Sequence, residues 1–419
     1  MLQAARRPEF VFTWTGAITD ALNWSFYLVV SIWWIKELSL SPVRLVSLGV
    51  IVQITIIAME VPSGVAADLL SRKHTIVLSR VLMGVSILVM VVSRNYLMLL
   101  GAQTISGVSW ALRSGGEVAW LTDELRSDSA RSNELDLDET VAHLLLRKHR
   151  LGLALAVVGI PIATVVGMRS LVVSVRMAGA GYLIVALLTA VLMTERGFVS
   201  GSERGETFLS VLRQGARVVK ARPRLRRIVL VAAGISLAGD TLDFLGLKRF
   251  LDTTGTVESS IVPMAAWFLV AVASGFIVNS IVSRKVGGSS DLSRITATMF
   301  VAAAFGIAMA ALSNLAILIG LGLIVQDSMR ETFDPVLEGW VNRDAPPEVR
   351  ATIHSMVSQA QSVTDIGAGL VWGLVAQLLS VPTALLGIAF VVAGVAWLAA
   401  GVPSESDRNQ VEARRQPTR

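Results

Sequence analysis

The sequence has no cysteine among its 419 residues, which excludes disulfide bonds, thiolate chemistry and cysteine-ligated metals. Its four histidines are scattered and show no HExxH or other metal-binding spacing. It also lacks a GxxxxGKS or GxxxxGKT loop, which would cradle ATP phosphates. We therefore expect neither a metalloenzyme nor a direct ATP-driven pump, and no cofactor.

Charged residues are also scarce. They make up 16% of the chain, whereas a soluble domain has roughly one quarter. Hydrophobic residues make up 53%, and the mean hydropathy is +0.64. A pI near 10 could suggest nucleic-acid binding, but the basic residues lie mostly in alternate loops, so no nucleic-acid partner is expected. The composition predicts an all-α integral membrane protein.

Apolar runs of about 20 residues can cross a bilayer as helices, and the chain has about twelve of them. Among them are Phe10–Ile35, Tyr96–Thr122, Leu151–Gly167, Ile228–Phe250 and Leu315–Val341. Lys and Arg gather in the loops on one side, which the positive-inside rule makes cytoplasmic. We expect a lipid-embedded, multi-pass monomer of a bacterial plasma membrane, with both termini in the cytoplasm.

The longest polar interruption, Thr194–Arg227, divides the spans into two sets of six. The predicted domains are a six-helix bundle at 1–194, a cytoplasmic linker at 195–227, a second bundle at 228–402 and a tail at 403–419. Apolar residues in the linker recur at helical spacing opposite basic ones, which predicts an amphipathic helix at the membrane surface: Phe208, Leu209, Leu212, Ala216 and Val219.

The two halves resemble each other. Span four carries Arg113 and Glu117, and the corresponding span ten also carries charges. The spacing from Gly16 to Asp20 in span one matches that from Gly239 to Asp243 in span seven. Such echoes suit two pseudo-symmetric six-helix bundles, a common construction of carriers with a substrate site near the membrane midplane.

Charges within the tenth span form the first candidate site: Asp327, Arg330, Glu331 and Asp334. At about 100° per residue they fall on one side of a helix, within an arc of roughly 100°. Ionisable groups at membrane depth normally face a protein interior or a water-filled cavity. The alternative for Arg330 is a fixed structural ion pair with Glu331 or Asp334.

The second candidate site joins spans one and four. Arg113 and Glu117 share a face, so the arginine could hold the glutamate ionised in one conformation and release it for protonation in another. Asp20 shares a face with Gly16, Asn23 and Tyr27 in span one. These residues are candidates for proton coupling, and a fixed pair of Arg113 with Glu117 is again the alternative.

Substrate contacts are expected from aromatic and acidic side chains within the spans: Trp24, Tyr27, Trp120, Asp240, Asp243 and Asp365. Aromatic rings can stack on a flat or cationic compound, although simple packing uses the same residues. Trp33, Trp34 and Trp340 lie near span ends, where interface anchoring is typical.

The loop after span two has the most specific pattern: Glu60, Pro62, Gly64 and Asp68, followed by Arg72 and Lys73. This pattern resembles the loop of the major facilitator superfamily, in which Gly, three residues, Asp and three residues precede Arg with Arg or Lys. The Glu, Pro and Gly are similar to those of bacterial drug-efflux carriers related to tetracycline and macrolide exporters. With the span count, the resemblance covers essentially the whole chain.

The resemblance implies an inner gate. Asp68 and Arg72 match gating positions, Asp123 at the inner end of span four is the expected partner of Arg72, and Glu60 and Asp334 belong to the same gate. A purely topological role of Arg72 and Lys73 is the alternative.

Two features depart from the family pattern. Gln103 stands where many proton-coupled exporters have arginine, and the antiporter motif of span five survives only as Gly152, Gly159, Ile160 and Pro161.

We therefore expect a secondary active transporter that exports a small, partly hydrophobic compound in exchange for protons by alternating access. An uptake symporter for a polar metabolite is the alternative with the same fold. A non-transporting membrane sensor is the alternative from a different class, and it would need no titrating cavity.

Overall fold

The computed structural model describes residues 7–69, 71–127, 134–195, 217, 219–288, 292–344 and 350–401. These residues form helices and short connections, and no strand occurs among them. The first half contains α2 (Pro8–Ile32), the π-helical turn η1 (Trp33–Glu37), α3 (Pro42–Leu69), α4 (Arg72–Met90), α5 (Tyr96–Ser127), α6 (Glu134–Arg169) and α7 (Leu171–Leu192). The second contains α9 (Pro223–Ser236), α10 (Gly239–Asp252), α11 (Val257–Gly288), α12 (Leu292–Leu312), α13 (Ala316–Asp344), α14 (Arg350–Leu378) and α15 (Val381–Ala400).

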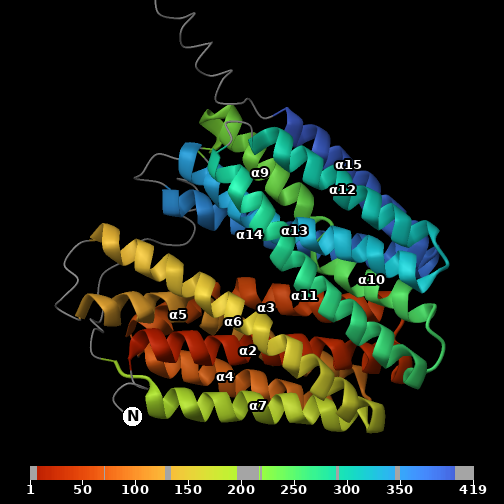
Figure 1. Cartoon of the computed structure of the whole chain (residues 1–419), viewed down its shortest axis with the longest axis horizontal. Helices are drawn as coiled ribbons and strands as arrows, with labels where there is room; N and C mark the ends of the chain where they lie inside the picture. The colour runs from red at the N-terminus through yellow and green to blue at the C-terminus, as the bar shows by residue number, and fades with distance from the viewer. Residues whose placement is uncertain are drawn as a thin grey trace, which may run out of the picture. The chain divides into compact units, whose positions relative to one another are not determined.

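The chain divides into two compact units at Gly205 and Glu206. The beginning of α3, 41–47, clusters with the second unit, and the beginning of α11, 256–269, clusters with the first. Within the first unit α2 packs on α6 and α7, and α4 packs on α5 and α7 (Figure 1). The corresponding pairs pack in the second unit: α9 on α14 and α15, and α12 on α13 and α15. The fold is therefore two pseudo-symmetric helical bundles.

Serine side chains cap the N-termini of three of these helices. Ser71 accepts a hydrogen bond from the His74 N–H at the beginning of α4, and Ser170 does the same for α7. Ser380 begins α15 in this way. Such N-caps satisfy backbone donors that have no partner within the helix, so adjacent spans can be joined by very short turns.

By length and hydropathy, eight helical segments of the described residues can cross a membrane, with α9 and α10 counted together. The described residues of four helices contain no such segment: α2, α5, α13 and α14. These four helices carry Asp20, Glu117, Arg330 and Asp365 respectively. Such helices are stable in a bilayer when their polar groups face protein or water.

Two expected spans differ from the structure. The seventh, Ile228–Phe250, is broken, since α9 ends at Ser236 and α10 begins at Gly239. The fifth was expected to begin at Leu151, but α6 begins at Glu134. The hydropathy pattern missed this start because the residues before Leu151 are rich in charge. Lys148 consequently lies within a helix rather than in a loop.

The prediction that Trp33, Trp34 and Trp340 anchor the protein at the membrane interface is wrong. Their exposed fractions are 2%, 1% and 1%, so the protein covers all three rings. Trp33 and Trp34 lie in the π-helical turn η1, whose wider winding redirects the side chains from the course of the preceding α-helix. Interior packing uses the same aromatic residues as the interface, and sequence position alone did not separate the two.

Glycine permits the closest helix contact, between α12 and α13. A Cβ on Gly322 would lie 2.2 Å from the Gly306 carbonyl oxygen, and one on Gly306 would lie 2.4 Å from the Gly322 carbonyl oxygen. Backbone cannot move away as a flexible side chain can. The two helices can therefore approach this closely only because both positions lack a side chain.

We expect Gly322→Ala to destabilise the second unit by roughly 1–3 kcal/mol, the usual cost of overpacking. The measurement is thermal unfolding of the purified protein in detergent. Gly394→Ala is the matched control, because a Cβ at Gly394 would meet no atom within 4 Å. Equal melting temperatures for the two variants would contradict the close contact.

Candidate functional site

Glu117 in α5 is the centre of a charged network within the first unit. Its Oε1 lies 3.1 Å from Arg80 Nη2 of α4, and the exposed fractions of the two side chains are 12% and 3%. Arg80 Nη1 also donates to Thr189 Oγ1 of α7. Hydrogen bonds to the remaining polar atoms stabilise a buried ion pair, and Thr189 supplies one for Arg80, whereas Arg80 Nε is buried without a partner among the described residues. This arrangement ties three helices to one carboxylate.

Lys148 of α6 connects Glu117 to Asp20 of α2. Its Nζ lies 3.9 Å from Glu117 Oε2 and 4.0 Å from Asp20 Oδ2. Gly16 makes room for the lysine stem, since a Cβ at Gly16 would lie 2.5 Å from Lys148 Cδ. The ammonium is thus shared between two carboxylates at the outer limit of ion-pair distance.

Tyr182 of α7 completes the polar interior near Asp20. Its hydroxyl donates to Asn23 Oδ1 at 2.7 Å and lies 3.4 Å from the Thr19 carbonyl oxygen. The α2 face that carries Asp20 and Asn23 therefore points into the first unit, as the spacing in span one predicts. The sequence analysis did not propose Tyr182, Arg80 or Lys148. Arg80 had one signal, a charge within a span, and Lys148 had none because it seemed to lie in a loop.

The predicted ion pair between Arg113 and Glu117 is not formed. The Arg113 guanidinium lies over the Trp110 ring, with Cζ 4.0 Å from the ring centroid. Both oxygens of Glu117 instead face cations of other helices, Arg80 and Lys148. Sequence spacing showed that Arg113 and Glu117 share a helix face, but it could not show that long side chains from neighbouring helices reach the carboxylate first.

In the second unit Arg330 of α13 pairs with Asp243 of α10. Its Nη1 lies 3.0 Å from both carboxylate oxygens of Asp243. Asp240 and Asp327 also act electrostatically on this guanidinium. The structure thus brings together residues predicted for coupling and for substrate binding. Arg330 therefore has a partner on another helix, and its predicted pairing with Glu331 or Asp334 lies outside the described side chains.

Asp365 of α14 lies against the break between α9 and α10. A Cβ at Gly239 would lie 2.0 Å from Asp365 Oδ1, so only glycine fits there. Trp372 Nε1, also from α14, donates to the Leu237 carbonyl oxygen in the break at 3.1 Å. Among the described residues Asp365 Oδ1 is buried without a hydrogen-bond partner. Asp240 and Asp243 also act electrostatically on the Asp365 carboxylate, so acidic groups outnumber Arg330 here.

Four predicted site residues cannot be placed by their side chains. Those of Gly64, Asp68, Glu331 and Asp334 lie outside the described part of the structure, although their backbone belongs to α3 and α13. The predicted linker helix also falls mostly outside it, at 196–216 and 218. Glu60 is described, and its side chain is exposed in α3.

Arg72 and Asp123 form the ion pair that the gate resemblance implied. Arg72 Nη1 contacts Asp123 Oδ2 and also donates to the Ala119 carbonyl oxygen at 2.6 Å. The pair joins the beginning of α4 to the end of α5, and both side chains are about one-fifth exposed, at 18% and 19%. Arg72 therefore has a structural partner in addition to any topological role.

Glu195, which follows α7, holds the beginning of α4. Its carboxylate accepts from the Ser71 hydroxyl at 2.6 Å and from the Lys73 N–H at 3.1 Å. A carboxylate at a helix N-terminus is also favoured by the helix dipole. Close by, the Thr194 hydroxyl donates to Glu124 Oε2 at 2.9 Å. The sequence analysis missed these contacts because no motif connects residues so far apart in the chain.

We expect Glu195→Ala to lower the stability of the first unit by about 2 kcal/mol, because two hydrogen bonds to a charged acceptor are lost. Thermal unfolding measures this effect. Glu37→Ala is the matched control, since Glu37 pairs with an Arg94 side chain that is 72% exposed. A loss in Glu195→Ala no larger than in the control would contradict the assigned capping role.

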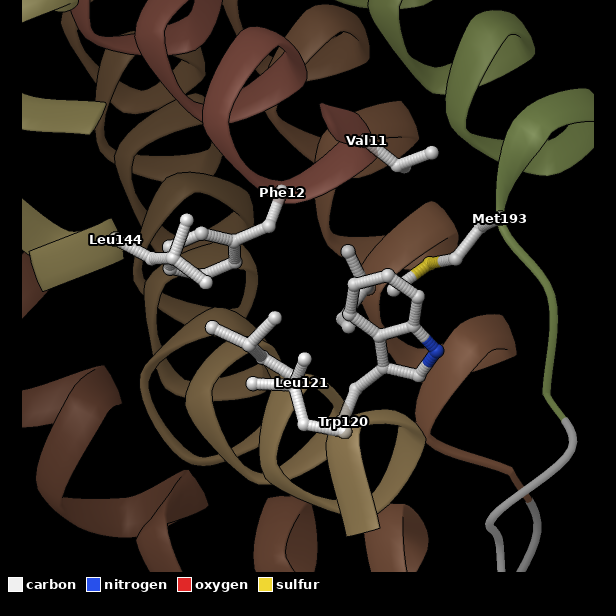
Figure 2. Close-up of a cluster of buried hydrophobic side chains, with 8 residues drawn as sticks. Val11, Phe12, Trp120, Leu121, Leu144 and Met193 are labelled. Carbon is white, nitrogen blue, oxygen red and sulfur yellow. The ribbon is translucent and has the colours of Figure 1, made fainter. Parts of the chain in front are cut away.

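Trp120 lies in an apolar cluster rather than beside the charged network. Figure 2 shows its ring among Val11, Phe12, Leu121, Leu144 and Met193. The ring is 2% exposed, and Nε1 donates to the Thr194 carbonyl oxygen at 2.7 Å. Packing partners on several helices cover the ring. In this structure Trp120 is therefore a packing residue, and the predicted substrate contact is not supported.

The other two aromatic candidates lie in α2. Tyr27 is 39% exposed, and its ring packs on Phe26 with 5.4 Å between centroids. The Trp24 ring meets Phe268 edge-on at 5.8 Å, in a part of α11 that clusters with the first unit. Tyr27 is therefore accessible to a ligand, whereas the Trp24 ring already has an aromatic partner.

Only solved structures are similar to this chain, and they cover nearly all of it. No family model and no curated protein matches the sequence. A solved structure of a single-residue mutant of the nucleoside transporter NupG has a TM-score of 0.74 at 13% identity and covers 94% of this chain and 100% of its own. An inward-facing bacterial homologue of the human lysosomal transporter Spinster gives 0.64 at 14%, with 98% of each chain covered. The human organic anion transporter MFSD10 gives 0.60 at 14%, with 94% of this chain and 99% of its own. The chain therefore has the major facilitator fold.

Proposed function

We propose that this chain is a secondary active transporter, which moves a small molecule across the membrane by alternating access and is driven by protons. The observation that carries the proposal is the network of Asp20, Lys148, Glu117 and Arg80 inside the first unit. A purely structural role would be met by a single balanced pair. Here one ammonium serves two carboxylates at near-equal distances, which gives the network two arrangements.

Proton coupling follows from these two arrangements. When Lys148 faces Glu117, Asp20 loses its ion-pair partner and is the better proton acceptor; when Lys148 faces Asp20, Glu117 keeps only Arg80. Opposite charge favours the ionised form of a carboxylate, and its withdrawal favours protonation. A small helix displacement can therefore exchange a proton. Deep carboxylates in transporters commonly serve in this way.

Export of a partly hydrophobic compound is the direction that we propose. The loop pattern from Glu60 to Lys73 supports it through its resemblance to drug-efflux carriers. The Arg72 contact with Asp123 is consistent with a gate at that end of the first unit. Uptake of a polar metabolite is the second candidate, which is favoured by Gln103 in place of arginine and by the reduced motif of span five.

The test compares small molecules retained by cells that produce the wild-type chain, with and without a protonophore. Export predicts that at least one compound is retained more strongly when the protonophore is added. Uptake predicts that accumulation of a compound is abolished instead. If no compound distinguishes producing cells from control cells under either condition, the transport proposal fails.

A further inference from the structure

Arg113 is a cation of the first unit's polar interior that the network leaves without a carboxylate. Arg80 and Lys148 occupy both oxygens of Glu117, and Lys148 also faces Asp20. Among the described residues no carboxylate lies within ion-pair distance of Arg113, and its N–H groups have no hydrogen-bond partner. The polar interior of the first unit thus holds three cations, Arg80, Arg113 and Lys148, and two carboxylates, Asp20 and Glu117.

A guanidinium within a membrane span is costly when no carboxylate contacts it directly. Arginine at the centre of a transmembrane helix costs about 2.5–3.5 kcal/mol on insertion scales, and such residues normally have a partner. Two other arginines within spans follow this rule, since Arg80 pairs with Glu117 and Arg330 pairs with Asp243. Arg113 makes no such direct contact among the described residues, although its charge acts electrostatically on Asp20 and Glu117.

The Arg113 guanidinium is positioned to bind an oxyanion. It lies over the Trp110 ring, which is one helical turn earlier in α5. Its N–H donors have no hydrogen-bond partner among the described residues. These donors match the two oxygens of a carboxylate or phosphate in a bidentate contact. Arg113 is also partly exposed, unlike Arg80, so a ligand can reach it.

We propose that Arg113 binds the anionic group of the transported compound, which is therefore an organic anion with a carboxylate or phosphate. This assignment rests on the proposed transport function. Binding of such an anion balances the first unit's charge, because the third cation then has its counter-charge. The same charge balance disfavours amines, which would add a further positive charge to three cations and two carboxylates.

Thermal unfolding with phenyl compounds of different charge tests the proposal, and three of the four share the phenylpropyl skeleton. The probes are phenylpropionate and phenyl phosphate as anions, phenylpropionamide as the neutral analogue and phenylpropylamine as the cation. A ligand that binds the folded state raises its melting temperature. We expect at least one anion to raise the melting temperature of the wild type and neither other compound to match it.

The variants Arg113→Gln and Arg113→Lys give the residue-specific result. We expect Arg113→Gln to bind the anion at least about tenfold more weakly, since a charge-assisted contact is lost, and Arg113→Lys to bind with intermediate affinity. Because Arg113 has no carboxylate partner to disrupt among the described residues, both variants should fold without ligand as the wild type does. An unchanged anion shift in Arg113→Gln, an equal shift with the amine or amide, or no shift with either anion would overturn the proposal.

Transport is measured separately, in proteoliposomes under an imposed pH gradient. An anion that binds through Arg113 but is not moved by the gradient would leave the binding site intact and contradict proton-driven transport. Gradient-driven movement of an amine or a neutral compound, unaffected by Arg113→Gln, would support transport and overturn the anion site.

Discussion

Glu117→Gln is expected to abolish proton-driven accumulation, down to the level of protein-free vesicles, while exchange of labelled for unlabelled substrate continues. The amide keeps the shape of the side chain and still accepts a hydrogen bond from Arg80 through Oε1, but it cannot take up a proton. Exchange needs no net proton movement, so it separates lost coupling from lost binding. Flux under a pH gradient, measured beside exchange at equal pH, gives both quantities.

Asp252→Asn is the matched control for this variant. Asp252 is also a carboxylate paired with a lysine, Lys248, but its side chain is 45% exposed and the pair lies within one helix. We expect its gradient-driven flux to equal that of the wild type. Glu117→Gln with full gradient-driven flux would show that the carboxylate does not carry the proton, and a variant that loses exchange as well would assign Glu117 to binding.

Arg80→Gln should destabilise the first unit by about 3 kcal/mol, which is the lower end of the range for breaking a buried ion pair. The lower end applies because Lys148 still faces the other oxygen of Glu117. The double variant Arg80→Gln, Glu117→Gln removes both charges of the pair, so Glu117 is not left as a buried carboxylate without the Arg80 guanidinium. We expect the double variant to regain most of the lost stability and to remain uncoupled.

Thermal unfolding of the four proteins of this double-mutant cycle measures the coupling between the two residues. Arg330→Gln serves as the control, because the side chains of Arg330 and Asp243 are 36% and 38% exposed and water can replace the lost partner. Its expected cost is about 1 kcal/mol or less. If Arg80→Gln costs no more than Arg330→Gln, or if the double variant shows the sum of the single effects, the buried network has been misassigned.

The architecture was predictable because it follows from hydropathy and charge along the chain. Long apolar runs predict helices, and the alternation of Lys and Arg predicts how the helices thread the bilayer. The break at Leu237 and Ala238 was not predictable in this way, since both residues are apolar and both favour helices. Its cause is tertiary, because Asp365 and Trp372 of α14 occupy the space beside it.

The site was only partly predictable. Helical spacing identified Asp20, Glu117 and Arg330 as inward-facing, and the match between the two halves identified Asp243. The structure brings each of them to a charged partner. The partners themselves lie on other helices, and periodicity within one helix contains no information about them. Lys148 illustrates the limit, since charge-rich sequence before Leu151 looked like a loop although it belongs to α6, where Lys148 reaches Asp20.

The most direct test of the account is the internal pH of proteoliposomes that contain the wild-type chain, followed with a trapped pH-sensitive dye. A gradient of the compound identified by the retention experiment is imposed without any initial pH difference. The account predicts that the substrate gradient drives proton movement, and that Glu117→Gln carries the compound without a pH change. Substrate flux with no pH change in the wild type, or the same pH change in Glu117→Gln, would contradict proton coupling through this network.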